Sequence, residues 1–340
     1  MGAMWGRALA RIVLGSVCTA AGLLATVQAG ELQERDEVWE NGARLAQERK
    51  FAEIDRLTEA YLAQGSRTPS GLWKSGLLAG GVDEGLLRPK PSADADWDRL
   101  EAMTLEWARD RPDSALARVT HAEMIVRRGW AIRGGRYAHQ VAESAWRPFH
   151  GHINRARAYL ESEKRIASSN PDYYRLMLEI IKAQKGEGDP YPVLEEGIAR
   201  HPGYYPMYFS MLDYLLPKWH GDESKIEKFV KQAVDATETI EGQSMYARIY
   251  WYASQSDYGD DLFYRSFAHW DRMKDGFEDV LKRYPDQWNL QNYAKFACDA
   301  QDPDALGKLI RRVEMPLLIE AWGSRERFEA CERMAGQIRL

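Results

Sequence analysis

Hydrophobic positions recur along this chain with the spacing of amphipathic helices. In KFAEIDRLTEAYLAQ (50–64), Phe51, Ile54, Leu57 and Tyr61 lie three or four residues apart and therefore share one helical face. Residues 31–49 show a similar pattern, so the two segments predict a helical hairpin that turns near residues 49 and 50. The run YARIYWYAS (246–254) is rich in β-formers, but no second such run could pair with it, and we expect a helix there.

One sequence motif occurs four times. In each copy a helix ends, a proline follows and another helix begins. It reads WARDRPDSA (107–115), IASSNPDYY (166–174), IARHPGYYP (198–206) and LKRYPDQWN (281–289). Proline cannot continue a helix, and an aspartate suits the N-terminal dipole of the next one. Pro171 and Pro202 are 31 residues apart, close to the period of about 34 residues in tetratricopeptide repeats. Because the other intervals are longer, we expect an all-α chain forming an irregular tetratricopeptide-like α-solenoid of stacked helical hairpins.

Residues 65–92 interrupt this pattern with many glycines, prolines and serines. They predict a long loop with one short helical turn around Leu72–Leu78. A loop of this length is either functional or wraps its neighbours. The expected organisation is therefore a leader (1–29), an N-terminal helical hairpin with its long loop (30–92) and a helical-repeat domain (93–340).

The N-terminal residues have the three parts of a secretory signal peptide. Arg7 and Arg11 precede an uncharged apolar run (12–27), and Val27 and Ala29 are the small residues that a signal peptidase requires. We expect cleavage after Ala29 and a periplasmic or extracellular mature protein. An uncleaved membrane anchor is the alternative, although the run is short for a span. A third interpretation is a lipoprotein that carries its lipid on Cys18, but the residues before this cysteine match a lipobox poorly.

Net charge and cysteine content indicate which partners are excluded and whether the cysteines pair. The chain has a net charge of −5, which becomes −7 when Arg7 and Arg11 are removed with the leader. Such acidity argues against a nucleic-acid partner, which requires a basic face. After cleavage Cys298 and Cys331 are the remaining cysteines, and an oxidising compartment favours a disulfide between them over two separate thiols.

The stretch RRGWAIRGGRYAHQV (127–141) is the first candidate for chemistry. Gly129 and Gly134 have the spacing of a phosphate-binding loop, but Gly135 and Arg136 stand where Lys and Ser or Thr are required, and a helix precedes them. The structural interpretation is a helix that ends at Gly129, a turn, and a new helix from Arg136. The functional one is a binding turn, because arginines and flat aromatics are enriched at interfaces. Its candidate binding residues are Trp130, Arg133, Arg136 and Tyr137.

A second turn could contribute to the same surface. In LLPKWHGDESKIEKF (215–229), Pro217 ends a helix and Asp222 is a suitable N-cap for the next. Lys218 and Trp219 would line the face of the arginine turn if the solenoid curves that way.

Metal and catalytic signals are weak. His150 and His152 form a His-x-His pair, but nothing in the sequence supplies further ligands, so we predict neither a metal nor a cofactor. The adjacent acids Glu195–Glu196 and Asp260–Asp261 point in different directions and do not form a catalytic pair. We therefore assign no catalytic residue.

Several motifs in the same order resemble the bacterial family built on the domain of unknown function DUF4034. They are SRTPSGLWK, WAIRGGRYA, LLPKWHGD followed by YARIYW, FACDAQD and FEACERMA, and they cover the chain from about residue 45 to its end. The resemblance implies a tetratricopeptide-like helical protein, often exported, and carries no established activity.

The expected function is the binding of a protein or extended peptide in the cell envelope, without catalysis. Helical stacks commonly use their extended surfaces in this way. One alternative is a cell-envelope hydrolase with acids or histidines on the concave face and the 65–92 loop as a lid. Another is a permanent structural subunit of an envelope assembly. No nucleic-acid partner is expected, and membrane contact is expected only through an uncleaved leader.

Overall fold

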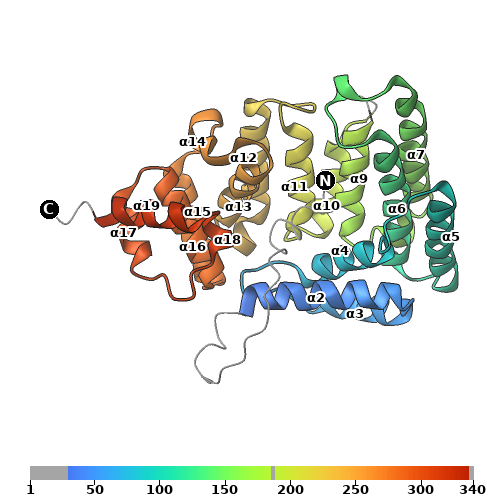
Figure 1. Cartoon of the computed structure of the whole chain (residues 1–340), viewed down its shortest axis with the longest axis horizontal. Coiled ribbons are helices and arrows are strands. Elements are labelled where there is room, and N and C mark those ends of the chain that lie inside the picture. The colour runs from blue at the N-terminus through green and yellow to red at the C-terminus, as the bar shows by residue number, and fades with distance from the viewer. Residues whose placement is uncertain (1–29, 185–187, 337–340) are drawn as a thin grey trace. The chain divides into compact units, whose positions relative to one another are not determined.

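Helices make up the regular secondary structure of the described residues. A computed structural model of the chain describes residues 30–184 and 188–336, and within these ranges it contains helices and no strand (Figure 1). The predicted all-α class is therefore confirmed. None of the described helices has the length and apolar character needed to cross a bilayer. The predicted leader with cleavage after Ala29 lies outside the described residues.

The described chain divides into two units, which we treat separately. The larger unit comprises residues 37–66 and 73–221, and the smaller unit comprises residues 30–36, 67–72 and 222–336. The domain boundary predicted near residue 92 remains a prediction. The helices of the larger unit are α2 (Gly30–Gln47, from Glu37 onward), α3 (Phe51–Ala63), α4 (Lys74–Leu86), α5 (Asp94–Asp110), α6 (Ala115–Arg133), η1 (Ala138–Gln140), α7 (Glu143–Ser162), α8 (Lys164–Ala167), α9 (Asp172–Ala183), α10 (Tyr191–Arg200) and α11 (Tyr205–Leu215).

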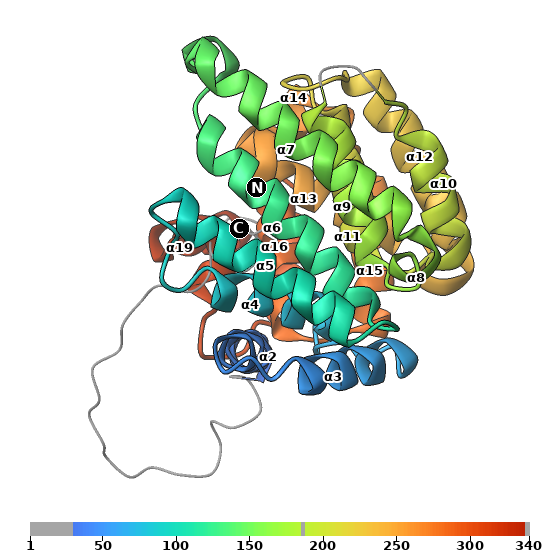
Figure 2. The ribbon, with the colours of Figure 1, turned by 90° about the vertical axis from the view of Figure 1, so that its right-hand side faces the viewer.

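Helix α6 is the central helix of the larger unit. It contacts α4, α5, α7 and α9, and Figure 2 shows α5, α6, α7 and α9 side by side. Twelve of its residues are buried, among them Leu116, Met124 and Ile125. The Ser114 side chain caps its N-terminus by accepting a hydrogen bond from the Ala117 amide at 3.0 Å. A helix buried on nearly all sides needs no single apolar stripe, which is why α6 lacks the clear periodicity of α3.

The proline motifs lie at helix boundaries, as predicted. Pro112 lies between α5 and α6, Pro171 directly precedes α9, and Pro202 lies between α10 and α11. The predicted hairpin turn lies at residues 48–50 between α2 and α3, and Arg49 has the left-handed φ of 55° that such a tight turn needs. The predicted cap at Asp222 also forms, because its carboxylate accepts a hydrogen bond from the Lys225 amide at 3.0 Å.

The prediction of a long loop over residues 65–92 is wrong, because α4 occupies Lys74–Leu86. Its glycines serve close helix packing and not chain reversal. A Cβ atom at Gly81 would lie 2.0 Å from the carbonyl oxygen of Trp39, and one at Gly85 would lie 2.2 Å from that of Ala43. Small residues let two helix backbones approach closely, so the glycines that resemble turn signals are contact positions between α2 and α4.

Two local predictions around residue 130 also need correction. Helix α6 continues through Gly129 and ends at Gly134, which has a φ of +76°. A Cβ atom at Gly129 would lie 3.1 Å from the Cβ of His152, so the glycine allows α7 to pack closely against α6. No helix starts at Arg136; the short turn η1 follows, and α7 begins at Glu143.

The smaller unit contains the remaining helices and the segment 67–72. The helical elements are α12 (Glu223–Glu241), α13 (Ser244–Ala253), η2 (Ser254–Tyr258), η3 (Gly259–Asp261), α14 (Leu262–Arg265), α15 (Trp270–Arg283), α16 (Gln287–Asp299), α17 (Pro303–Ile310), α18 (Ile319–Trp322) and α19 (Arg325–Gly336). The predicted helix over 246–254 is confirmed in α13, apart from its last residue, and its side chains are buried.

Polar contacts and a disulfide hold this unit together. The Glu31 carboxylate accepts hydrogen bonds from the Ser70 amide at 2.8 Å and the Thr68 hydroxyl at 2.9 Å, which anchors the segment 67–72. Cys298 and Cys331 are paired as a disulfide, with their Cα atoms 5.6 Å apart, as predicted. The bridge joins α16 to α19 near the C-terminus.

Candidate functional site

An aromatic cluster in the larger unit contains three of the sequence-predicted binding residues. The ring centroids of Trp130, at the end of α6, and Trp219, in the turn after α11, are 6.3 Å apart in an edge-to-face arrangement. Arg133 lies between two indoles, with its guanidinium carbon 5.1 Å from the centroids of both Trp130 and Trp146. Phe149 supports Trp130 from α7 at 4.9 Å. These five residues are called the aromatic cluster below.

The turn that carries Trp219 is held by short-range contacts. The Trp219 amide donates to the Leu216 carbonyl at 2.8 Å, and a ring nitrogen of His220 lies 3.0 Å from the Lys182 carbonyl oxygen. Gly221 passes so close to Leu215 that a Cβ atom there would lie 1.9 Å from the Leu215 carbonyl oxygen. Trp219 therefore projects from a tightly packed turn, which limits the conformational entropy that binding would cost.

The other three predicted binding residues lie outside the aromatic cluster. Arg136 and Lys218 are exposed. Tyr137 is 73% exposed and stacks on His139 with centroids 6.0 Å apart. The structure thus gathers Trp130, Arg133 and Trp219 and leaves Arg136, Tyr137 and Lys218 on the surface of the neighbouring turns.

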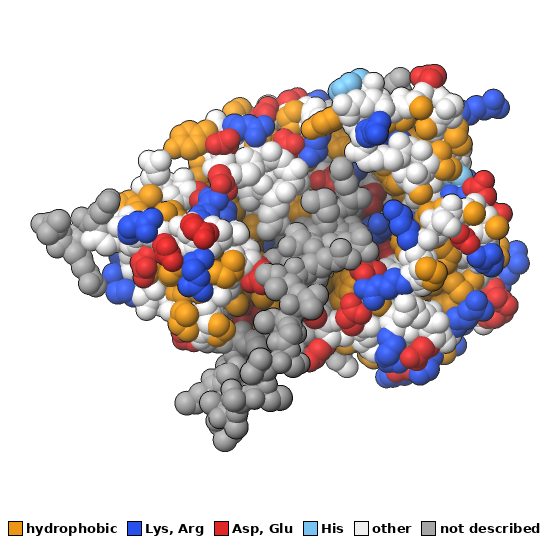
Figure 3. Space-filling view, in the orientation of Figure 1, with side chains coloured by type: hydrophobic (Ala, Val, Ile, Leu, Met, Phe, Trp, Pro, Cys, Tyr) orange, Lys and Arg blue, Asp and Glu red, His pale blue; other side chains and the backbone are white. Residues whose placement is uncertain are grey.

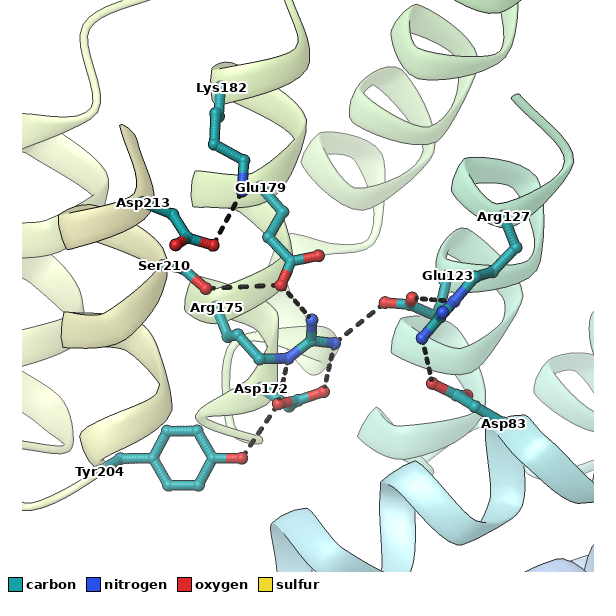
Figure 4. A network of polar contacts seen from close by, with 10 residues as sticks. All are labelled: Asp83, Glu123, Arg127, Asp172, Arg175, Glu179, Lys182, Tyr204, Ser210 and Asp213. Carbon is teal, nitrogen blue, oxygen red and sulfur yellow. Dashed lines mark hydrogen bonds and ion pairs between the residues drawn. The ribbon is translucent and has the colours of Figure 1, made fainter. Parts of the chain in front are cut away.

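A network of buried charges lies beside this cluster, and the sequence interpretation missed it. Its centre is Arg175 of α9 (Figure 4). The guanidinium donates to Asp172 at 2.6 and 2.7 Å, to Glu179 at 2.9 Å and to Glu123 of α6 at 3.0 Å. The Arg175 side chain is only 14% exposed, and that of Glu123 is 3% exposed. One arginine therefore holds three carboxylates from two helices.

The network extends from Arg175 in both directions. Arg127 donates to Glu123 at 2.7 Å and lies 3.7 Å from Asp83 of α4. On the other side, the Lys182 ammonium donates to Asp213 of α11 at 3.1 Å. Hydroxyl groups complete it: Tyr204 donates to Asp172 at 2.9 Å, and Ser210 donates to Glu179 at 3.5 Å. These ten residues, all drawn in Figure 4, are called the charge network below.

Helical spacing explains how the charge network forms. On α9, Asp172, Arg175, Glu179 and Lys182 follow one another at intervals of three or four residues and share one face. Glu123, Arg127 and Trp130 do the same on α6. The sequence did carry a signal for this network, namely a stripe of charged residues on an otherwise apolar helix. Charged side chains are buried only when they are paired, so such a stripe indicates a matching charged stripe on a neighbouring helix.

Lys182 connects the charge network to the aromatic cluster. Its ammonium lies 5.5 Å from the ring centroid of Trp219, and its side chain is 5% exposed. Near the N-terminal end of the two stripes, Arg175 of α9 binds Glu123 of α6. Seven residues further along each helix, Lys182 and Trp130 both contact the Trp219 ring. Helices α6 and α9 therefore run in the same direction, and their polar and aromatic side chains form one continuous set of contacts with α11, of which the charged part is buried.

The pKa values of two carboxyl groups in the charge network are shifted in opposite directions. Burial, reinforced by the nearby Glu123, raises the pKa of Asp83 well above its ordinary value. Burial also opposes ionisation of Glu123, but the guanidinium groups of Arg127 and Arg175 outweigh it and lower the pKa to about 2. Asp83 therefore tends to keep a proton under conditions in which Glu123 is ionised.

Residues with metal-binding potential are not gathered in the described part of the chain. Across residues 30–184 and 188–336, no three His, Cys, Asp or Glu side chains are arranged to hold a metal ion. His150 stacks on Trp146 at 5.7 Å, and His152 lies 3.2 Å from an Arg155 nitrogen, so both have contacts of another kind.

Charges of both signs are mixed over the visible surface. Figure 3 shows Lys and Arg side chains interspersed with Asp and Glu on the described part of the face in view. That distribution differs from the basic stripe of a nucleic-acid-binding surface.

No protein-family model, curated protein or solved structure matches the chain. Membership of the DUF4034 family therefore remains a prediction.

Proposed function

We propose that this chain is an exported helical-repeat protein that binds a protein or peptide partner in the cell envelope and has no catalytic role. The proposal includes the periplasmic or extracellular location, the cleaved leader and an irregular tetratricopeptide-like α-solenoid. Support for the repeat comes from the larger unit, where α6 and α9 run in the same direction and α7 packs against both. This is the pattern of stacked helical hairpins.

The observation that carries the proposal is the contact between Trp130 and Trp219. These residues lie 89 positions apart in the sequence, yet their rings meet at 6.3 Å and both are partly exposed. Partly exposed tryptophans held by rigid neighbours are typical anchors of protein interfaces. Because the charge network behind these residues is buried, a partner segment would contact the aromatic cluster and the exposed residues of the neighbouring turns.

The experiment is partner capture from cells that export the tagged protein, after chemical cross-linking. Trp130→Ala and Trp219→Ala should reduce the captured partner while leaving the far-ultraviolet circular dichroism spectrum unchanged. Phe51→Ala removes a stacked aromatic elsewhere in the larger unit, where Phe51 packs on Trp107 at 4.5 Å, and serves as the matched control. Full capture by both tryptophan variants would refute the role of this surface.

A cell-envelope hydrolase is the second candidate, and one observation favours it. Asp83 and Glu123 both lie against Arg127, at 3.7 and 2.7 Å, and their pKa values are displaced in opposite directions, as in carboxyl pairs that divide the roles of acid and base. The test is release of soluble fragments from purified peptidoglycan by the wild type, Asp83→Asn and Glu123→Gln. Release that both variants abolish while their circular dichroism spectra stay unchanged would support the hydrolase, and no release by the wild type would exclude peptidoglycan as its substrate.

A further inference from the structure

Arg133 differs from most other arginines of α6 and α7 in how it is held. Arg127 and Arg128 bind carboxylates of the protein at 2.7 Å, and Arg155 and Arg157 bind them at 2.6 and 2.8 Å. Arg133 instead donates one amino group, Nη1, to the backbone carbonyls of Gly134 at 2.9 Å and Arg136 at 3.0 Å. Among the described residues no carboxylate lies within ion-pair distance of it.

The two indoles hold the Arg133 guanidinium in one orientation. Trp130 and Trp146 both lie 5.1 Å from its central carbon, and the backbone bonds occupy only Nη1. Within the part of the chain that the structure describes, Nε and Nη2 donate to no acceptor. These two atoms form the edge of a guanidinium that binds a carboxylate through two parallel hydrogen bonds.

The local charge around Arg133 is positive although the chain is acidic. Arg136 and Arg147 are exposed, and neither forms an ion pair with any described residue. Glu143 is the one acid between residues 130 and 150. An anionic group is therefore attracted at short range, while the net charge of −5 repels polyanions such as nucleic acid or an anionic membrane.

We infer that the Nε and Nη2 edge of Arg133 binds a carboxylate of an acidic peptide segment, whose neighbouring residues pack on Trp130, Trp146 and Trp219. This inference rests on the proposed function, because it names the chemistry of the partner at the aromatic cluster. Lysine could not replace the arginine fully, because its ammonium cannot form the paired, planar contact.

The test is a selection from a phage-displayed library of random 12-residue peptides on the immobilised full mature chain. Peptides enriched on the wild type should be rich in Asp and Glu, and a selected peptide should lose about tenfold or more in affinity when its acids become Asn and Gln. Arg133→Gln should cause a similar loss and Arg133→Lys a smaller one. Arg56→Gln, an exposed arginine on α3, should leave affinity unchanged.

The outcomes of this selection separate a failure of the carboxylate site from a failure of the proposed peptide binding. Enriched peptides without excess acids, or acidic peptides that bind Arg133→Gln as tightly as wild type, would overturn the carboxylate site while peptide binding stands. No enrichment over the bare support would instead contradict the proposed function. Sedimentation with phosphatidylglycerol vesicles that depends on Arg133, without acidic peptide binding, would overturn the inference in favour of a lipid phosphate.

Discussion

Replacing Arg175 by methionine should strongly destabilise the larger unit. The substitution keeps the aliphatic volume but removes the guanidinium that contacts Asp172, Glu179 and Glu123 together. These carboxylates are 10%, 13% and 3% exposed, so water solvates them poorly once the arginine is lost. Breaking a buried ion pair on one side costs about 3–5 kcal/mol, against a total stability of about 5–15 kcal/mol for a typical domain.

The assay is urea unfolding of the purified protein, followed by tryptophan fluorescence and circular dichroism. Arg44→Met is the matched control, because Arg44 pairs with Glu48 at 2.8 Å in an exposed contact, and water and salt screen such a pair so that its loss should change stability little. Adding Glu123→Gln and Glu179→Gln to the Arg175→Met variant should recover much of the lost stability, because the unpaired charges are then removed. A loss below about 1 kcal/mol for Arg175→Met would refute the view that this arginine neutralises a buried acid cluster.

Three further predictions concern other parts of the chain. Gly85→Val should destabilise by several kcal/mol in thermal unfolding, because the new Cβ would lie 2.2 Å from the Ala43 carbonyl oxygen; an unchanged melting temperature would contradict the close helix contact. Reducing the Cys331 disulfide should lower stability by up to about 4 kcal/mol in the chain-entropy estimate, and equal stability with and without reductant would contradict a constraining bridge. Burial lowers the pKa of His121 to about 4, so folding should lose stability as pH falls from about 6.5 to about 4, and His121→Gln should flatten that dependence in urea titrations.

Local signals in the sequence were sufficient for many helix boundaries. Pro171 and Pro202 end helices through their own covalent geometry, and Asp222 caps one with its own side chain. Such signals act within a few residues and can be read from one segment. The disulfide was predicted for a different reason, since the expected export to an oxidising compartment favours pairing of the two cysteines that would remain after cleavage.

The errors arose where a residue's role depends on a distant segment. The glycines of α4 look like turn residues until Trp39 and Ala43 of α2 are seen to pack against them. The charge network was missed because Glu123 and Arg175 are 52 residues apart, although each lies on a recognisable charged stripe of its own helix. Proximity of Trp130 and Trp219 was only a conditional expectation, since it depends on how the hairpins stack.

The central claim is that the surface around Trp130 and Trp219 binds a partner in the cell envelope. Its most direct test is photo-cross-linking in living cells, with benzoylphenylalanine in place of Tyr137, which is 73% exposed on the turn after α6. We predict one dominant adduct that disappears when Trp219→Ala is added and that is absent when the photoprobe replaces Arg56 on α3. No adduct at position 137, or one that persists in the Trp219→Ala variant, would contradict the account.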